Sequence, residues 1–222
     1  MFYEEFTIKL IKFLRTVWDR VIFLDLETKN LENKFLHNER ILSVCFSRRV
    51  NGKLCEEKGV EAKCLLLEED DESEKNLLTG LDRELMKIRP LGVIGYGLRR
   101  YDIPLLIIKE ERCKEGSGKR WWKINDMLES AAHIDLYHLF KYYGLGGKLH
   151  EVLNSKISED LPSIRAKDSI SADRNLKGMQ IYDLWKNSKP AFKKYALGDV
   201  IDLQLILEKI IVNDFQTSHF DQ

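Results

Sequence analysis

The chain of 222 residues carries no net charge, because 36 lysines and arginines balance 36 aspartates and glutamates. A balanced chain exerts no long-range pull on polyanions, so any affinity for nucleic acid must come from local patches or from bound metal. This counts against a protein that coats DNA tightly and without specificity.

Zinc-binding cysteine patterns and membrane-length apolar runs are also missing. The four cysteines form no Cys-x-x-Cys pair and have no histidine at zinc spacing, which argues against a zinc ribbon or finger; they are Cys45, Cys55, Cys64 and Cys113. We interpret them as core thiols in a reducing compartment. Charged residues interrupt the first 20 positions, which excludes a signal-peptide core, and no later run could span a bilayer. We therefore expect a cytoplasmic protein with no membrane partner.

The order of apolar patterns along the chain predicts one α/β domain over residues 1–222, with a short amphipathic helix within residues 1–20. Strands are predicted at residues 21–28, 41–46, 62–67, 91–96 and 131–136, and helices at 74–88, 103–112, 137–143 and from about 190 to 212. Asn51-Gly52 predicts a hairpin turn whose return begins over residues 53–58. Residues 155–189 show weak periodicity and predict no element. A hairpin meander followed by alternating helices and strands is typical of a mixed sheet with helices packed on it.

Two carboxylates end the first predicted strand. Side chains alternate along a strand, so Asp25 and Glu27 lie on the same face. A carboxylate in an apolar setting is costly without a partner, which indicates a positive group between them. Mg²⁺ and Mn²⁺ prefer oxygen ligands. For this pair alone, two solvated acids at a strand end remain the alternative.

The final predicted helix carries a third acid on its apolar face. Counting about 100° per residue, the apolar stripe contains Phe192, Tyr195, Ala196, Leu203, Ile206, Leu207 and Ile210. Asp199 falls in the middle of this stripe, where a carboxylate is easier to explain as a metal ligand than as a structural residue. Tyr195 lies one turn before Asp199 and projects to the same place. Asp202 falls near the stripe's edge, so we expect it on the surface.

A glycine turn between a predicted strand and a predicted helix supplies a fourth acid. Asp102 precedes Ile103-Pro104 and could simply cap the helix, because Asp is a preferred N-cap residue. A carboxylate at a helix start can also hold a metal-bound water, so both roles remain open. Arg99 and Arg100, just before it, could contact phosphates or be two solvated loop residues.

In this order, the segments resemble the three exonuclease motifs of the DEDD (DnaQ-like) superfamily. The matching residues are Asp25-x-Glu27, the glycine-led segment ending in Tyr101-Asp102-x-Pro104, and Tyr195-x-x-x-Asp199. The tyrosine is similar to the DEDDy branch, which includes the proofreading domain of family-B DNA polymerases. Residues 133–136 and 148–153 also resemble the segment between the second and third motifs. The resemblance covers about residues 20 to 212.

The resemblance implies a ribonuclease-H-like fold: a mixed five-stranded sheet with helices on both faces. It also implies metal-dependent 3′-to-5′ removal of nucleotides from the 3′ end of single-stranded DNA, or of RNA, with two Mg²⁺ or Mn²⁺ ions. Asp25 would bridge both ions, Glu27 and Asp199 would complete the first site, and Asp102 would hold the second mostly through water. Tyr195 would orient the attacking water; a tyrosine with an ordinary pKa near 10 is a poor base at neutral pH, so metal polarisation must do most of the deprotonation.

Candidate substrate contacts are Thr28, Arg99, Arg100 and Lys148. The chain departs from the family at Gly97, where the second motif commonly carries an asparagine, and the missing side chain could neither grip substrate nor brace the carboxylate. The alternative function is therefore a catalytically weak or inactive module with this fold, which binds nucleic acid within a replication or repair complex. We favour an active exonuclease, because all four acids and the tyrosine are present.

Overall fold

The computed structural model describes residues 2–30, 39–68, 73–114, 124–142 and 174–217. Within them, five strands form one sheet in the order β3-β2-β1-β4-β5. The strands are β1 (Val21–Asn30), β2 (Glu39–Arg49), β3 (Val60–Leu66), β4 (Gly92–Gly95) and β5 (Ala132–Asp135). β1, β2 and β3 form an antiparallel meander, whereas β4 pairs in parallel with both β1 and β5. The predicted mixed five-stranded sheet is confirmed.

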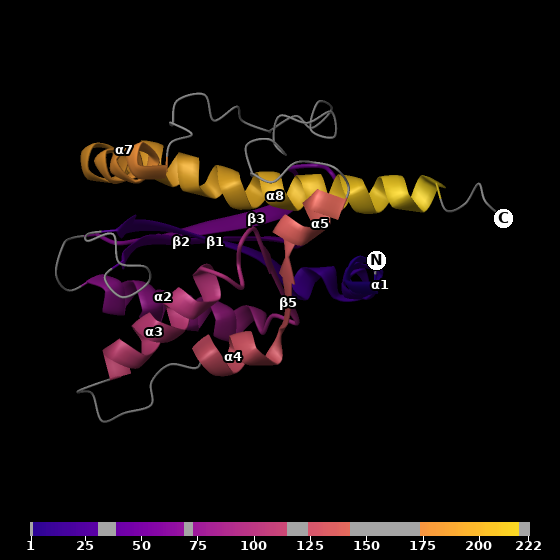
Figure 1. Ribbon diagram of the computed structural model, residues 1–222, viewed down its shortest axis with the longest axis horizontal. Helices are drawn as coiled ribbons and strands as arrows, with labels where there is room; N and C mark the ends of the chain where they lie inside the picture. The colour runs from indigo at the N-terminus through magenta and orange to yellow at the C-terminus, as the bar shows by residue number, and fades with distance from the viewer. Residues whose placement is uncertain (1, 31–38, 69–72, 115–123, 143–173, 218–222) are drawn as a thin grey trace.

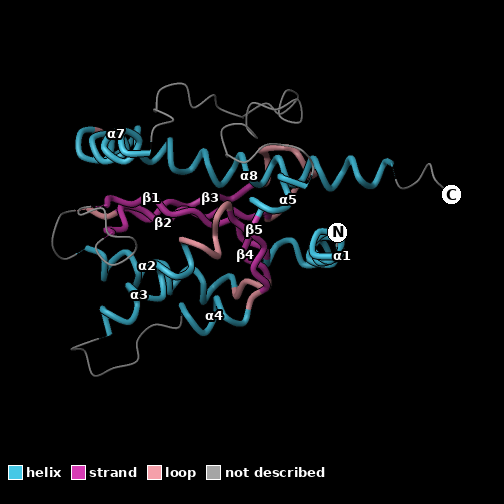
Figure 2. The backbone as a smooth tube through the Cα atoms, viewed as in Figure 1, coloured by secondary structure: helices cyan, strands magenta, loops and turns pink. Residues whose placement is uncertain are grey.

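Helices cover both faces of this sheet (Figures 1 and 2). They are α1 (Phe2–Leu14), the 3-10 helix η1 (Arg15–Arg20), α2 (Ser73–Ile88), α3 (Asp102–Lys114), α4 (Ile124–Ser130), α5 (Leu136–Tyr142), α7 (Arg174–Asn187) and α8 (Lys189–Thr217). Figure 1 shows α8 lying along one face of the meander, with α7 beside its start, and α2, α3 and α4 below the other face. Among the described residues, no helix is both long enough and apolar enough to cross a bilayer.

The core is apolar on both sides of the central strands because each strand faces a helical layer. On β1, Ile22, Phe23 and Leu24 are all almost completely buried, so this strand has no solvent-facing side over that stretch. Such a continuous apolar run is expected of a strand that is covered on both faces. The charged residues of β1 begin only where this run ends, at Asp25.

Three expectations for the connecting segments need correction. Residues 53–58, predicted to begin the return strand, contain no strand; Gly52 turns the chain with φ +80° and β3 starts only at Val60. Two helices, α4 and α7, were not predicted. α4 has seven residues, too few to show a helical period, and α7 buries Ile181 and Trp185 while its Met179 is exposed, which blurs its apolar stripe.

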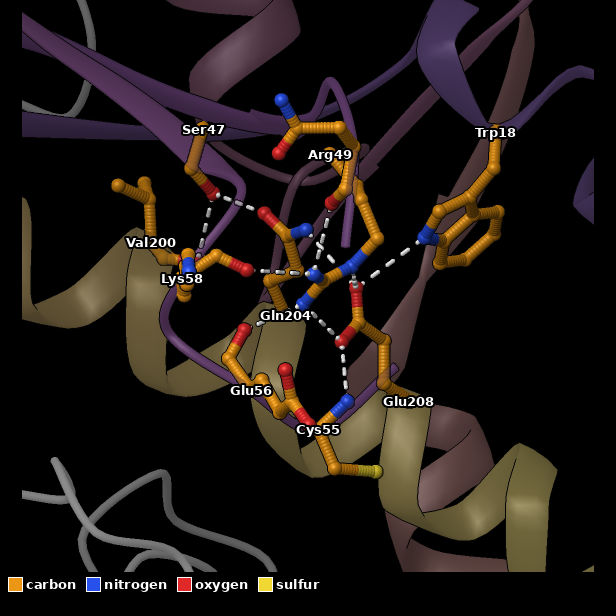
Figure 3. Close-up of polar contacts among 10 residues, drawn as sticks. Trp18, Ser47, Arg49, Cys55, Glu56, Lys58, Val200, Gln204 and Glu208 are labelled. Atoms are coloured by element: carbon orange, nitrogen blue, oxygen red, sulfur yellow. Dashed lines mark hydrogen bonds and ion pairs between the residues drawn. The ribbon is translucent and has the colours of Figure 1, made fainter. Parts of the chain in front are cut away.

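A buried ion pair fastens α8 to the end of β2 (Figure 3). Arg49 donates two hydrogen bonds to the carboxylate of Glu208, from Nε at 2.7 Å and from Nη2 at 2.6 Å. The side chains are 5% and 0% exposed, respectively. The indole Nε1 of Trp18 and the backbone N–H of Cys55 also donate to Glu208, at 3.1 and 2.8 Å. These four hydrogen bonds, and a fifth from Gln204, leave little of the carboxylate's charge unsatisfied, which is what a buried carboxylate requires.

The same hydrogen-bond network continues along α8 toward Asp199. Gln204 donates from Nε2 to Glu208 Oε1 at 2.9 Å, and the hydroxyl of Ser47 lies 2.8 Å from Gln204 Oε1 and 3.0 Å from the carbonyl oxygen of Val200. Both are acceptors, so the Ser47 hydroxyl donates to one at a time. Because Val200 directly follows Asp199, these contacts fix α8 along β2 right beside the acid that the sequence singled out.

Replacing Glu208 tests how strongly this network holds the fold. Glu208→Gln keeps the side-chain size but leaves the Arg49 guanidinium buried without a charge partner, so we expect the free energy of unfolding to fall by about 3–5 kcal/mol. The measurement is urea denaturation at pH 7.

The neighbouring pair Arg48–Glu61 provides a matched control, because its side chains are 26% and 38% exposed. Glu61→Gln is expected to cost at most about 1 kcal/mol. Equal losses in the two variants would contradict a special role for the buried pair.

Candidate metal centre

β1 delivers two acids to one face of the sheet. In the ladder with β2, Asp25 lies opposite Cys45 and Glu27 lies opposite Ser43. The register shifts between Glu27 and Thr28. An irregularity of this kind bends a strand and re-aims its side chains. The regular alternation of β1 therefore ends directly after the second acid.

α8 adds a third acid from the distant end of the chain. Asp25, Glu27 and Asp199 each offer one carboxylate oxygen such that these atoms all lie within 4.8 Å of one another. Glu27 is 7% exposed and Asp199 is 3% exposed. The structure thus brings together three of the four acids that the sequence nominated, and their oxygen donors suit a hard divalent cation such as Mg²⁺ or Mn²⁺.

Tyr195 lies beside this three-acid cluster. Burial is the main cause that raises the pKa of its hydroxyl well above the ordinary value, and the charges of Glu27, Asp199 and Asp25 add to it. The phenol therefore stays protonated at neutral pH. It can donate or accept a hydrogen bond, but it cannot serve as a base.

Asp102 occupies the first position of α3 and is buried. It is not one of the three acids within 4.8 Å of one another. Burial raises its pKa well above the ordinary value, and the charges of Asp25, Glu27 and Asp135 raise it further. Asp102 therefore lies outside the three-acid cluster but close enough to feel the charges of Asp25 and Glu27.

Asp135 lies in the segment 133–136 that resembles the family, but the sequence motifs gave it no role in the site. It ends β5, opposite Gly95 of the parallel strand β4. Its Oδ1 accepts hydrogen bonds from the backbone N–H groups of Gly97, at 2.9 Å, and Tyr137, at 3.1 Å. Asp135 thus clamps the glycine turn to the start of α5. The available signal was its place at the carboxyl end of a predicted parallel strand, the edge of a sheet where sites form.

Thr28 and Tyr101 connect the first two motifs directly. The Thr28 hydroxyl donates to Glu39 Oε2 at 3.2 Å and lies 2.7 Å from the Tyr101 hydroxyl. If Thr28 gives its single hydrogen to Glu39, Tyr101 must be the donor to Thr28. The Thr28 hydroxyl, predicted to contact substrate, is thus engaged within the protein, where it ties the end of β1 to the turn before Asp102.

The predicted phosphate contacts have different outcomes. Arg99 and Arg100 are both exposed, and the Arg100 guanidinium lies over the Tyr137 ring, 5.5 Å from its centroid. The structure does not bring either arginine into the three-acid cluster. Lys148 lies outside the described residues.

The expectation that Asp202 is a surface acid is wrong, since only 1% of it is exposed. A single apolar stripe describes a helix that packs on one side only. Residues 198–208 of α8 are all buried, so the face that the stripe assigned to solvent is covered as well.

The fold defined by this sheet and its two helical layers is ribonuclease-H-like. Among solved structures, the chain is similar to a family B DNA polymerase from the hyperthermophilic archaeon Pyrobaculum calidifontis, with a TM-score of 0.58 and 15% identity over 86% of this chain and 24% of the polymerase. It also matches E. coli exonuclease I in complex with a dA16 oligonucleotide, with a TM-score of 0.40 and 13% identity over 78% of this chain and 42% of exonuclease I. The chain therefore spans less than half the length of either protein. The sequence matches no protein-family model and no curated protein.

The raised pKa of Asp102 predicts a pH-dependent gain in stability when its charge is removed. In the folded chain, deprotonating Asp102 works against burial and three neighbouring acids, so its charge costs stability above the ordinary aspartate pKa of about 3.9. We expect Asp102→Asn, in EDTA at pH 7, to raise Tm by about 2 °C or more, since about 1 kcal/mol shifts Tm by about 2–4 °C in a chain of this size. Asn is as good as Asp at a helix start, so the start of α3 is preserved.

The sign of this effect follows from the linkage between protonation and folding. As pH falls toward about 3.9, wild-type Asp102 becomes protonated in both the folded and unfolded states, so the advantage of the variant must shrink. Thermal melts over a pH series measure it. A variant that is less stable than the wild type at every pH would contradict this account.

Proposed function

We propose that the chain is a metal-dependent 3′-to-5′ exonuclease that removes nucleotides from the 3′ end of single-stranded DNA. The observation that carries the proposal is the convergence of Asp25, Glu27 and Asp199, whose ligand atoms lie within 4.8 Å of one another. Three carboxylates this close, two of them buried, offer the oxygen ligands that divalent cations prefer. The order of the motifs in the sequence supports the same activity, and the fold is one that suits it.

The four acids fit two ions in the arrangement that the resemblance implies. Asp25, Glu27 and Asp199 would hold one Mg²⁺ or Mn²⁺, and Asp25 with the more distant Asp102 would hold the other. Bound there, such ions supply activation of a water and stabilisation of the leaving 3′-oxygen. The position of Asp102 outside the three-acid cluster suits a contact made through water.

The remaining residues of the site position groups rather than move protons. Tyr195 stays protonated, so its hydroxyl orients the attacking water by a hydrogen bond. The Tyr101–Thr28 hydrogen bond holds the turn before Asp102 against the end of β1. Arg99, exposed on the same turn, contacts a substrate phosphate.

Substitution of single site residues tests this division of roles. We expect Asp25→Asn or Asp199→Asn to abolish degradation of a 5′-labelled single-stranded oligonucleotide from its 3′ end, because each removes a charged metal ligand. Tyr195→Phe should slow it by about 10- to 100-fold, the usual range for a group that supports a metal site. Product ladders with Mg²⁺, with Mn²⁺ and with EDTA are the measurement, and Glu61→Gln is the surface control.

Equal loss in all three variants would contradict the role given to Tyr195. If the wild type gives no metal-dependent ladder even with Mn²⁺, the chain is instead a binding or accessory module that keeps the fold. Matched DNA and RNA oligonucleotides in the same assay decide which sugar the enzyme accepts, because that choice depends on contacts around the 2′-position.

Gly97 allows a direct test of the departure in the second motif. It has φ +77°, and a Cβ atom built there would meet no atom within 4 Å. Asn tolerates this left-handed backbone better than most residues. If the missing amide limits the grip on substrate, Gly97→Asn should raise the cleavage rate severalfold.

Gly97→Ala is the matched control for this change, because it adds backbone strain of about 1–2 kcal/mol without an amide. We expect Gly97→Ala to be no faster than the wild type. If Gly97→Asn is also no faster, the absent side chain is not what limits the rate.

A further inference from the structure

Three strands place two thiols in line with the first acid of the cluster. Asp25 on β1 lies opposite Cys45 on β2, and Cys45 lies opposite Cys64 on β3. Direct partners across a ladder project to the same face of a sheet, so the three side chains form one row. The proposed exonuclease chemistry uses neither thiol.

The two thiols of this row differ in access and in acidity. Cys45 is 1% exposed, and its thiol donates weakly to the Ser43 hydroxyl at 4.0 Å. When the Cys45 thiol turns its one hydrogen from Ser43 to Cys64, it lowers the pKa of the half-buried Cys64; burial opposes this change, and Ser43 and the positive charge of Lys193 add to it. A partly exposed thiol in such surroundings is the reactive kind.

We propose that Cys45 and Cys64 form a redox-active dithiol whose oxidation to a cross-strand disulfide weakens divalent-metal binding by Asp25, Glu27 and Asp199. The backbone already suits the bridge. Residues directly opposite in an antiparallel pair have Cα atoms about 4.5 to 5.5 Å apart, which lies inside the range of about 4.4 to 6.8 Å seen for disulfides. β3 is the edge strand of the sheet, so Cys64 can be reached from solvent.

A hydroperoxide such as hydrogen peroxide is the oxidant. The Cys64 thiolate attacks one peroxide oxygen, the O–O bond breaks, and hydroxide leaves, so that Cys64 becomes a sulfenic acid. The Cys45 sulfur then attacks the Cys64 sulfur, the S–S bond forms, and the sulfenic oxygen leaves as water with the Cys45 proton. In total, two thiols give up two protons and two electrons, and one peroxide becomes two waters.

The bridge reaches the acids through β2. It holds the Cys45 sulfur toward β3, at the position where β2 lies beside Asp25, and it removes the hydrogen that Cys45 donates to Ser43. Ser43 is the cross-strand partner of Glu27. The disulfide therefore disturbs the neighbours of two of the three acids. This step rests on the proposed metal site, whereas the formation of the disulfide does not.

Mapping the disulfide tests the dithiol on its own. The reduced full chain is treated with hydrogen peroxide and digested, and mass spectrometry identifies the linked peptides. We expect one bridge, between Cys45 and Cys64. Cys55 and Cys113 are internal controls, because burial is the main cause that raises the pKa of each thiol. Iodoacetamide at pH 7 should alkylate Cys64 before either of them. No bridge, or a bridge to another cysteine, overturns the proposal.

Binding of Mn²⁺ tests the coupling without any substrate. Electron paramagnetic resonance should show about tenfold weaker Mn²⁺ binding after oxidation, at the low end of what changes around metal ligands cost, with recovery after dithiothreitol. Cys64→Ser, at the sheet edge, should bind Mn²⁺ like the reduced wild type before and after peroxide. Equal affinity of the oxidised and reduced wild type overturns the coupling. A reduced chain that binds no Mn²⁺ overturns the proposed function, while the peptide map still decides whether the dithiol exists.

Discussion

Repulsion between carboxylates is the constraint around which this site is organised. The fold gathers Asp25, Glu27 and Asp199 within hydrogen-bonding reach of a common point and adds the charges of Asp102 and Asp135 nearby. The pKa of both Asp102 and Tyr195 rises because the surroundings are dry and negative. Repulsion between neighbouring carboxylates costs free energy, which the packing of the rest of the fold offsets.

The anchoring of α8 decides whether its acid reaches the other two. Asp199 can face β1 only if the last helix keeps its position on the sheet, and the contacts of Glu208, Gln204 and Ser47 hold that position with groups contributed by β2 (Figure 3). Trp18 joins the same network from η1, just before β1 begins. The helix α8, which carries Asp199, is thus held to η1 and β2, the elements that precede and follow β1 in the sequence.

Simple periodicities were enough to nominate most of the acidic residues. Alternation along a strand put Asp25 and Glu27 on one face, and a helical period put Asp199 beside Tyr195; neither inference needs long-range information. The mixed sheet followed from the order of patterns. Asp202 was misplaced because a stripe drawn on an isolated helix cannot show that residues 198–208 are covered all round. Burial of that kind depends on which other segments pack nearby, and a local pattern does not contain this.

The contacts between motifs were beyond sequence reasoning for the same reason. Asp135 holds the Gly97 turn, and Thr28 holds Tyr101, across separations that no period describes. α7 was missed because its buried Trp185 and Ile181 share the helix with the exposed Met179. Local patterns identified the acidic residues that carry charge, and tertiary packing determined which polar groups hold them in place.

The Glu208 network and the three-acid cluster differ in the groups that surround their carboxylates. Glu208 receives an arginine from within the chain, together with an indole and a backbone donor, so its charge is balanced once the chain has folded. The charges of neighbouring acids raise the pKa of both Asp102 and Tyr195. Asp25, Glu27 and Asp199 instead bring three carboxylate oxygens within 4.8 Å of one another, a set of donors that suits a hard divalent cation. The hydrogen bonds of Glu208 thus serve the packing of α8, whereas the proposed metal binding depends on the three-acid cluster.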